Sequence, residues 1–306
     1  MARDSCDTRE YCDEILVPAE GTEELRGHMG AVSARRRPRA FAAALATLAI
    51  TAGLAAAPAQ AVDKEKYIAL GDSYAAGQGA GPYLDACYRS DNAYSQLADE
   101  AKSIQLVVNA ACSGKTTWDV VNSQLRQLNK STELVTITAG GNNIGFGDII
   151  TASGAALANP AAGPACDAAT ASAAAMIQSG QLTQDVISMI QSVKAAAPNA
   201  RIVVTGYPYL YDPVTPNPAD PLSLFIQQAT VLANGLDASI AAAASATGVQ
   251  YVDVRGAFAG HGVNSADPWI NLDLANPSSP DNFHPNAAGY EAYFAALSGS
   301  GAYSVP

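Results

Sequence analysis

The sequence predicts an α/β fold, a three-layer sandwich in which helices cover both faces of a five-stranded, mostly parallel sheet. After residue 61 the chain contains five short apolar segments rich in β-branched residues, and segments with helical patterns separate them. The apolar segments lack the alternation of a half-exposed strand, as expected for strands that are covered on both faces. No repeat of solenoid period and no long linker divides this part of the chain, so a single domain is expected.

The predicted elements alternate along the chain. The predicted strands comprise residues 67–71, 104–109, 134–138, 201–205 and 249–254. The predicted helices comprise residues 92–102, 116–128, about 168–197, 222–246 and 286–297. Residues 154–166 and 207–221 lack a period and are rich in Ala, Gly or Pro, so we expect surface loops there. Ligands bind at the carboxyl ends of the strands in such sheets, and residues that directly follow a strand are therefore the first site candidates.

The N-terminal 61 residues have the order of parts found in a secretory signal peptide. A basic cluster at residues 35–39 precedes an apolar run at 41–57, and the segment ends in Pro58-Ala59-Gln60-Ala61, which predicts cleavage after Ala61. A membrane anchor is disfavoured because the run is short and mostly alanine. Residues 1–28 are acidic and precede a second methionine, which a misplaced start codon would explain. We expect a secreted domain of residues 62–306 without a stable membrane anchor, exported by either the general or the twin-arginine route.

Composition and charge narrow the classes of function. The chain has 306 residues, of which 49% are hydrophobic and 15% charged, so it can bury a sizeable core and is not of the disordered type. Its formal net charge is −11, which argues against nucleic acid as a partner. We expect a monomer that acts on a small molecule or a lipid.

Five cysteines are present, but Cys6 and Cys12 lie in the segment that is predicted to be removed. Cys87, Cys112 and Cys166 remain. Export permits disulfides, and an odd number of cysteines leaves one outside an intramolecular pair. The count alone does not choose the pair.

A candidate nucleophile follows the first predicted strand, in the sequence Gly71-Asp72-Ser73-Tyr74. A serine just past the carboxyl end of a strand faces the binding edge of the sheet, where a base can reach it. Asp and Ser are also favoured N-cap residues, so these residues alone do not distinguish catalysis from capping. A serine hydroxyl becomes a good nucleophile only when a neighbouring imidazole takes its proton.

The search for that imidazole is short, because residues 62–306 contain only His261 and His284. His284 precedes a predicted helix and has Asp281 three residues upstream, a spacing that lets the carboxylate reach Nδ1 and fix the tautomer. His261 lies between two glycines without a carboxylate close in sequence, as a surface or packing residue does. The pattern therefore predicts His284 as the base and Asp281 as its support, although Asp281 could instead cap a turn.

Two further strand ends offer donors for a developing oxyanion. Asn142 stands in Gly140-Gly141-Asn142-Asn143 after the third strand, and Gly114 follows the second. Each alone fits an ordinary turn. Together with Ser73 and one supported histidine they predict acyl transfer. With two histidines and no clustered acidic or cysteine ligands, the sequence predicts neither a metal nor a cofactor.

These motifs, in this order, resemble the SGNH hydrolases, also called GDSL lipases or esterases, and in particular their secreted actinobacterial members. The resemblance covers essentially all of residues 62–306. It implies a flavodoxin-like α/β/α fold, with Ser73 as nucleophile and Asp281 and His284 completing a triad. It also implies an oxyanion hole formed by the main chain of Ser73 together with Gly114 and Asn142.

The chain departs from the family pattern at two points. Asn143 stands where the third motif usually has an aspartate, but activity is expected to survive because Asn142 carries the side-chain role. Secreted relatives usually carry three disulfides, whereas this segment has three cysteines. By position, the resemblance implies that Cys87 and Cys112 form a disulfide and that Cys166 has lost its partner.

The expected function is hydrolysis of lipid or short-chain carboxylic esters through an acyl-enzyme on Ser73, which is an analogy with the family. Two alternatives stay open. The substrate could be an acetylated polysaccharide, because Tyr207, Tyr209, Tyr211 and Trp269 could stack on sugars. The chain could also be an exported binding protein that keeps the fold and lacks the chemistry.

Overall fold

The computed structural model describes residues 63–101, 103–150, 152 and 163–304, to which every structural statement below applies. The predicted signal peptide and its cleavage site at Ala61 lie outside the described residues, as does most of the predicted loop at 154–166.

The centre of the fold is a parallel sheet, as predicted. Its strands are β1 (Glu65–Gly71), β2 (Ile104–Asn109), β3 (Leu134–Thr138), β4 (Arg201–Thr205) and β5 (Gln250–Val252). Their order is β2-β1-β3-β4-β5, and every neighbouring pair is parallel. All side chains of β3 are buried, which explains why its sequence is apolar without alternation.

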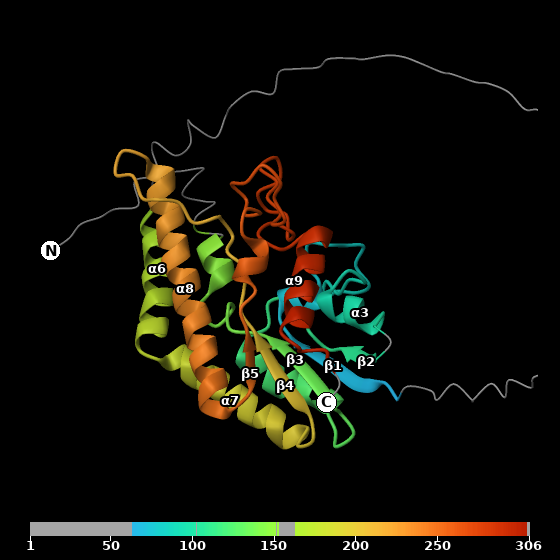
Figure 1. The fold of residues 1–306 in the computed structure, drawn as a ribbon. Coiled ribbons are helices and arrows are strands. Elements are labelled where there is room, and N and C mark those ends of the chain that lie inside the picture. The colour runs from blue at the N-terminus through green and yellow to red at the C-terminus, as the bar shows by residue number, and fades with distance from the viewer. Residues whose placement is uncertain (1–62, 102, 151, 153–162, 305–306) are drawn as a thin grey trace, which may run out of the picture. The chain divides into compact units, whose positions relative to one another are not determined.

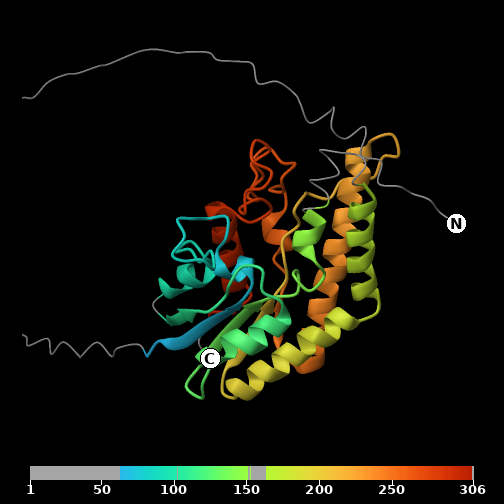
Figure 2. The same ribbon diagram turned by 180° about the vertical axis from the view of Figure 1, so that it is seen from behind.

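Helices cover both faces of the sheet. They are α2 (Ser73–Ala76), α3 (Tyr94–Asp99), α4 (Thr117–Asp119), α6 (Gly163–Gln178), α7 (Gln181–Ala196), α8 (Pro221–Thr247) and α9 (Ala287–Gly299). Helices α3 and α9 lie on one side, with α6, α7 and α8 on the other (Figure 1). The reverse view shows α7 running across the second face (Figure 2). The three-layer α/β/α prediction is confirmed.

The single helix predicted at 168–197 is wrong, because the segment forms two helices, α6 and α7. Gly180 separates them with a left-handed φ of 76°, and its amide bonds the carbonyl of Ile177. A glycine tolerates this conformation, which ends a helix. Helix α6 also begins at Gly163, so residues 163–166 are helical and do not belong to the predicted loop.

The helix predicted at 116–128 is also interrupted. After α4 the chain makes a π-helical turn over Val120–Gln124 and a 3₁₀ turn over Leu125–Gln127. Gln124 then lies buried, and its side-chain amide bonds both the amide and the carbonyl of Gly71, each at 2.8 Å. The irregular turn thus clamps the end of β1, which fits the frequent occurrence of π turns at functional sites.

Candidate active site

The end of β1 holds the candidate nucleophile in a fixed turn. Gly71 has a φ of +131°, and a Cβ there would clash with the carbonyl oxygen of Thr138 on β3. Asp72 caps α2 by accepting the amide of Tyr74 at 3.0 Å, and Ser73 is the first residue of that helix. The helix cap that the sequence allowed as an alternative for Ser73 therefore belongs to Asp72.

The structure brings Ser73 and His284 together across 211 residues of sequence. Ser73 Oγ lies 2.8 Å from His284 Nε2, and the two residues are 7% and 8% exposed. His284 Nδ1 lies 3.1 Å from the main-chain carbonyl oxygen of Asn282. A carbonyl can only accept, so Nδ1 carries the proton and Nε2 presents its lone pair to the serine hydroxyl.

The predicted hydrogen bond between Asp281 and His284 Nδ1 is replaced by this main-chain contact. The Asp281 carboxylate instead accepts a hydrogen bond from the hydroxyl of Tyr83, which in turn accepts the amide of Gly79 at 2.9 Å. Phe283 explains the difference, because its left-handed φ of 62° closes a turn in which the His284 amide bonds the Asp281 carbonyl. Asp281 still acts on the imidazole through its charge, which raises the pKa of His284.

Burial dominates the ionisation of the imidazole. Desolvation lowers the pKa of His284 to about 4, against the opposing effects of the Asn282 carbonyl and the Asp281 charge. A neutral imidazole is the form that can accept a proton from Ser73. At neutral pH the pair is thus in the protonation state required for attack.

Several side chains hold the loop that carries His284. The Tyr74 hydroxyl donates to the Phe283 carbonyl at 2.6 Å, and the Tyr74 ring lies 5.2 Å from the imidazole. Asn271 donates to the carbonyls of both Gly79 and His284, at 2.9 and 3.0 Å. These bonds join the loop of the base to the serine helix α2 and to the segment that follows it.

The candidate oxyanion donors follow β2 and β3, as predicted. Asn142 Nδ2 donates to the Lys115 carbonyl at 3.0 Å, which ties the Asn142 loop to the Gly114 loop and leaves a second N–H. Gly114 has a left-handed φ of +76°. Asn143 donates to Thr117 and Asp185 at 2.7 and 3.3 Å. The asparagine at this unusual position therefore has a structural use, and it leaves Asn142 in place.

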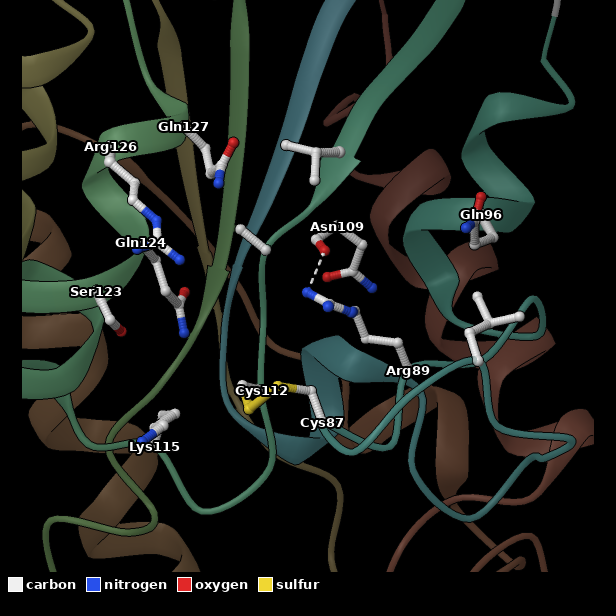
Figure 3. Close-up of a pocket in the computed structure, with 13 residues that line it drawn as sticks. Cys87, Arg89, Gln96, Asn109, Cys112, Lys115, Ser123, Gln124, Arg126 and Gln127 are labelled. Atoms are coloured by element: carbon white, nitrogen blue, oxygen red, sulfur yellow. Dashed lines mark hydrogen bonds between the residues drawn. A yellow bond between two sulfur atoms is a disulfide. The ribbon is translucent and has the colours of Figure 1, made fainter.

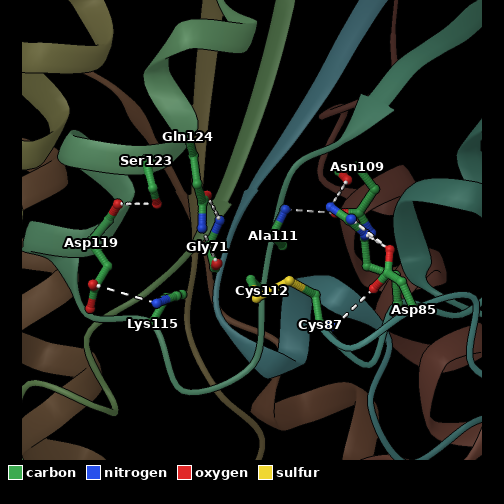
Figure 4. Close-up of a disulfide and its surroundings, with 11 residues drawn as sticks. Gly71, Asp85, Cys87, Asn109, Ala111, Cys112, Lys115, Asp119, Ser123 and Gln124 are labelled. Carbon is green, nitrogen blue, oxygen red and sulfur yellow. Dashed lines mark hydrogen bonds and ion pairs between the residues drawn. A yellow bond between two sulfur atoms is a disulfide. The ribbon is translucent and has the colours of Figure 1, made fainter.

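A disulfide braces the Gly114 loop. Cys87 and Cys112 are bonded, with their Cα atoms 4.4 Å apart (Figure 4). The Ser113 amide bonds the Cys87 carbonyl at 3.1 Å. The pairing implied by the family resemblance is confirmed. Cys166 is buried in α6 and takes no part in this bond.

Removing this disulfide is expected to destabilise the fold. The loop between Cys87 and Cys112 spans 25 residues, for which the chain-entropy estimate is about 3 kcal/mol. Urea unfolding of the double variant Cys87→Ser/Cys112→Ser should show this loss of unfolding free energy relative to the oxidised wild type. Equal urea midpoints for oxidised and reduced wild-type protein would contradict the expectation.

A groove of about 500 Å³ is lined in part by the two disulfide cysteines (Figure 3). Its lining includes the cationic side chains of Arg89, Lys115 and Arg126. Arg89 is paired with Asp85 at 2.5 Å and Lys115 with Asp119 at 3.6 Å. Neither Ser73 nor His284 lines the groove, so it is distinct from the site described above.

The second histidine and the loop aromatics are engaged in packing. The imidazole of His261 stacks on Trp269 with ring centroids 3.4 Å apart, and its Nδ1 lies 3.4 Å from the Asp267 carboxylate. Tyr207 and Tyr211 are buried, and the Tyr209 hydroxyl donates to Asn234 at 2.7 Å. These contacts disfavour the sugar-stacking role that the sequence left open.

Three groups contribute to the site in ways that the sequence did not predict. They are the main-chain carbonyl of Asn282, the hydroxyl of Tyr83 and the hydroxyl of Tyr207, which donates to Asp72 at 2.5 Å. Tyr207 follows β4 by two residues, so the strand-end rule could have identified it. The other two give no signal in the sequence.

Among the residues that the structure describes, 63–101, 103–150, 152 and 163–304, no helix is long and apolar enough to cross a membrane. Within the same ranges, no group of three or more His, Cys, Asp or Glu side chains is placed to hold a metal ion.

Residues 69–292 match the model of the GDSL-like lipase/acylhydrolase family. Lipase 1 of Streptomyces coelicolor is 34% identical over 260 residues, covering 82% of this chain and 92% of the relative. A lipase of Streptomyces rimosus is 36% identical over 253 residues, covering 80% and 89%.

Two solved structures agree with these relatives. The phospholipase A1 of Streptomyces albidoflavus superposes with a TM-score of 0.66 at 33% identity, covering 77% of this chain and 99% of that one. The extracellular lipase of Streptomyces rimosus superposes with a TM-score of 0.67 at 33% identity, covering 76% and 98%. As its motifs predict, the chain belongs to the GDSL-like lipase/acylhydrolase family and is a carboxylic ester hydrolase.

Proposed function

We propose that the chain cleaves its ester through an acyl-enzyme on Ser73, with His284 as general base and then general acid. The observation that carries this proposal is the 2.8 Å contact between Ser73 Oγ and a buried imidazole whose other nitrogen faces a carbonyl oxygen. His284 takes the hydroxyl proton as Ser73 Oγ attacks the ester carbonyl carbon. It returns that proton to the leaving alcohol, and a water molecule repeats the cycle on the acyl-enzyme.

The oxyanion of each tetrahedral intermediate is proposed to bind to the Ser73 amide, the Gly114 amide and the side chain of Asn142. Two of these groups lie on loops that the Asn142–Lys115 hydrogen bond joins. Donors that are already placed cost no reorganisation during the reaction, which is why such groups supply a large share of the rate enhancement. In this proposal Asp281 supports the imidazolium by charge and fixes the loop through Tyr83.

The proposed substrates are lipid or short-chain acyl esters. Relatives named lipase and a structural neighbour named phospholipase A1 support this class. An acetylated polysaccharide is less favoured, because the tyrosines that could stack on sugars are buried or bonded within the protein. A binding protein without chemistry is disfavoured by the contact between Ser73 and His284.

We also propose that the protein is secreted as residues 62–306 and acts as a monomer, without metal, cofactor or nucleic acid. A relative described as an extracellular lipase and the disulfide between Cys87 and Cys112 support secretion. The basic and apolar segments before Ala61 support removal of a signal peptide.

The substrate class is tested by initial rates on p-nitrophenyl esters of graded chain length, phosphatidylcholine and acetylated xylan. Acyl esters should be cleaved with a preference among chain lengths, and Ser73→Ala should abolish that turnover. A fluorophosphonate probe should label the wild type and leave Ser73→Ala unlabelled. Turnover of xylan acetate alone would reject the lipid proposal, and an unlabelled, inactive wild type would reject catalysis at Ser73.

Replacing Asp281 with asparagine should have a small effect. In a triad where the carboxylate binds the imidazole, this change costs about 10⁴-fold in kcat because the tautomer is wrong. Here the Asn282 carbonyl fixes the tautomer, so Asp281→Asn should lower kcat by about tenfold or less, through loss of its charge. Steady-state kinetics distinguish the two cases. A loss of kcat of ~10⁴-fold would show that the Asp281 carboxylate binds the imidazole directly during the reaction.

The activity of the enzyme should persist into mildly acidic solution. Burial lowers the pKa of His284 to about 4, so the base stays neutral above that pH and becomes protonated below it. The value of kcat/KM should therefore fall as the pH drops through about 4, and it should change little between about pH 5 and about pH 7. A histidine with the ordinary pKa of ~6.5 would instead lose activity within that range. A midpoint near the ordinary value would contradict the effect of burial.

A further inference from the structure

We propose that Tyr207 is a positioning residue for catalysis, because its hydroxyl bridges the turn that carries Ser73 and the loop that carries Asn142. The nucleophile and the oxyanion donors come from different strand ends and are not adjacent in sequence. A rigid link between those strand ends would fix their separation. The inference rests on the proposed roles of Ser73 and Asn142, and adds a residue that acts on them through Asp72 and Gly141.

The bridge consists of two hydrogen bonds to one oxygen atom. The Tyr207 hydroxyl donates to Asp72 Oδ2 at 2.5 Å and accepts the amide of Gly141 at 3.0 Å. Asp72 directly precedes Ser73, and Gly141 directly precedes Asn142. One phenol therefore joins the residues on the N-terminal side of the proposed nucleophile and of the proposed side-chain donor.

The acceptor of the bridge, the carboxylate of Asp72, is buried. Asp72 is 1% exposed, and burial raises its pKa to about 7. Its Oδ1 accepts the Tyr74 amide, so the Tyr207 hydroxyl is the side-chain donor to its other oxygen. No ion pair to Asp72 occurs in the part of the chain that the structure describes. A buried acceptor that loses its donor is costly, so the turn would shift to find another.

Tyr207 is itself anchored at its main chain and its ring. Its amide donates to the buried Asp237 of α8 at 3.0 Å, and Arg255 lies 3.1 Å from the same carboxylate. Its ring packs edge-to-face on Tyr74 with centroids 5.0 Å apart. The hydroxyl is thus presented from a fixed support, as a positioning group requires.

The test compares Tyr207→Phe with Tyr67→Phe. Both changes remove one buried tyrosine hydroxyl, since Tyr67 bonds Thr136 at 2.6 Å within the sheet, away from the site. Tyr207→Phe keeps the ring contact with Tyr74 and should lower kcat about 10- to 100-fold with little change in KM, the size expected when reacting groups are misplaced. Tyr67→Phe should lower the melting temperature and leave kcat close to wild type.

A second variant keeps the proposal testable if Tyr207→Phe does not fold. Asp72→Asn retains an acceptor for the Tyr74 amide but turns an N–H toward the phenol, and it should lower kcat over the same range. If the bridge is one unit, the double variant should lose no more than the larger single loss.

The outcomes separate this inference from the proposed function. Equal kcat in Tyr207→Phe and Tyr67→Phe, or multiplicative losses in the double variant, would overturn the bridge while Ser73→Ala still abolished turnover. A wild-type rate in Ser73→Ala would instead reject the proposed nucleophile, whatever the tyrosine variants showed.

Discussion

Replacing His284 with alanine should lower kcat by about 10⁴- to 10⁶-fold, with KM changed far less, and Ser73→Ala should do the same. Each change removes one side of the 2.8 Å contact between Ser73 Oγ and Nε2. Without the imidazole the hydroxyl keeps its ordinary, weak nucleophilicity. Because the two residues act as one unit, the double variant should be little slower than either single variant.

His261→Ala is the matched control, since His261 is the other histidine of the predicted domain and its imidazole packs on Trp269. Its kcat should stay within about twofold of wild type, as for a surface substitution away from the chemistry. Circular dichroism on all variants separates loss of catalysis from loss of fold. Comparable losses for the two histidines would refute the assignment of His284 as the base.

The sheet could be predicted from the sequence because its strands are buried on both faces. Strands β2, β3 and β4 begin and end at the predicted residues. Strand β1 begins earlier, at Glu65, because that carboxylate is buried beside Arg201 at 3.1 Å and an apolar pattern cannot include it. Strand β5 is shorter than predicted, at Gln250–Val252, since Val254 already has the helical backbone angles φ −97° and ψ −6° that lead into the 3₁₀ turn at Arg255–Phe258.

The hydrogen-bond acceptor of His284 Nδ1 could not be predicted from the sequence. The spacing of Asp281 and His284 is compatible with a side-chain hydrogen bond, and only the left-handed backbone of Phe283 turns the Asn282 carbonyl toward Nδ1 instead. Every residue has a carbonyl, and phenylalanine rarely adopts a positive φ. Nothing in the residue types therefore indicates which group faces the imidazole.

The role of Tyr207 could not be predicted for a different reason. Its position after β4 was informative, but an aromatic residue beside prolines is compatible with both a sugar platform and a packed side chain. The distinction depends on the buried carboxylate of Asp72, which lies 135 residues earlier in the sequence. The role of such a residue depends on its contacts with residues at the ends of neighbouring strands. Those contacts can be identified only when the order of the strands is known.

Asn142→Ala should lower kcat by about 10²- to 10³-fold, the cost of removing one side-chain oxyanion donor. One N–H of its amide is used on the Lys115 carbonyl at 3.0 Å, and the other is the proposed donor to the intermediate. KM should change little, because the donor acts on charge that develops in the transition state.

Asn199→Ala is the matched control, because it removes a hydrogen bond between two loops without removing a proposed oxyanion donor. Asn199 Nδ2 donates to the Lys130 carbonyl at 2.9 Å, the same kind of bond between loops, but it precedes β4 and so lies at the amino edge of the sheet. Both variants should lose similar unfolding free energy in urea, whereas only Asn142→Ala should lose turnover. If Asn142→Ala is as active as Asn199→Ala, then Asn142 only ties two loops together, and the oxyanion must be held by main-chain amides alone.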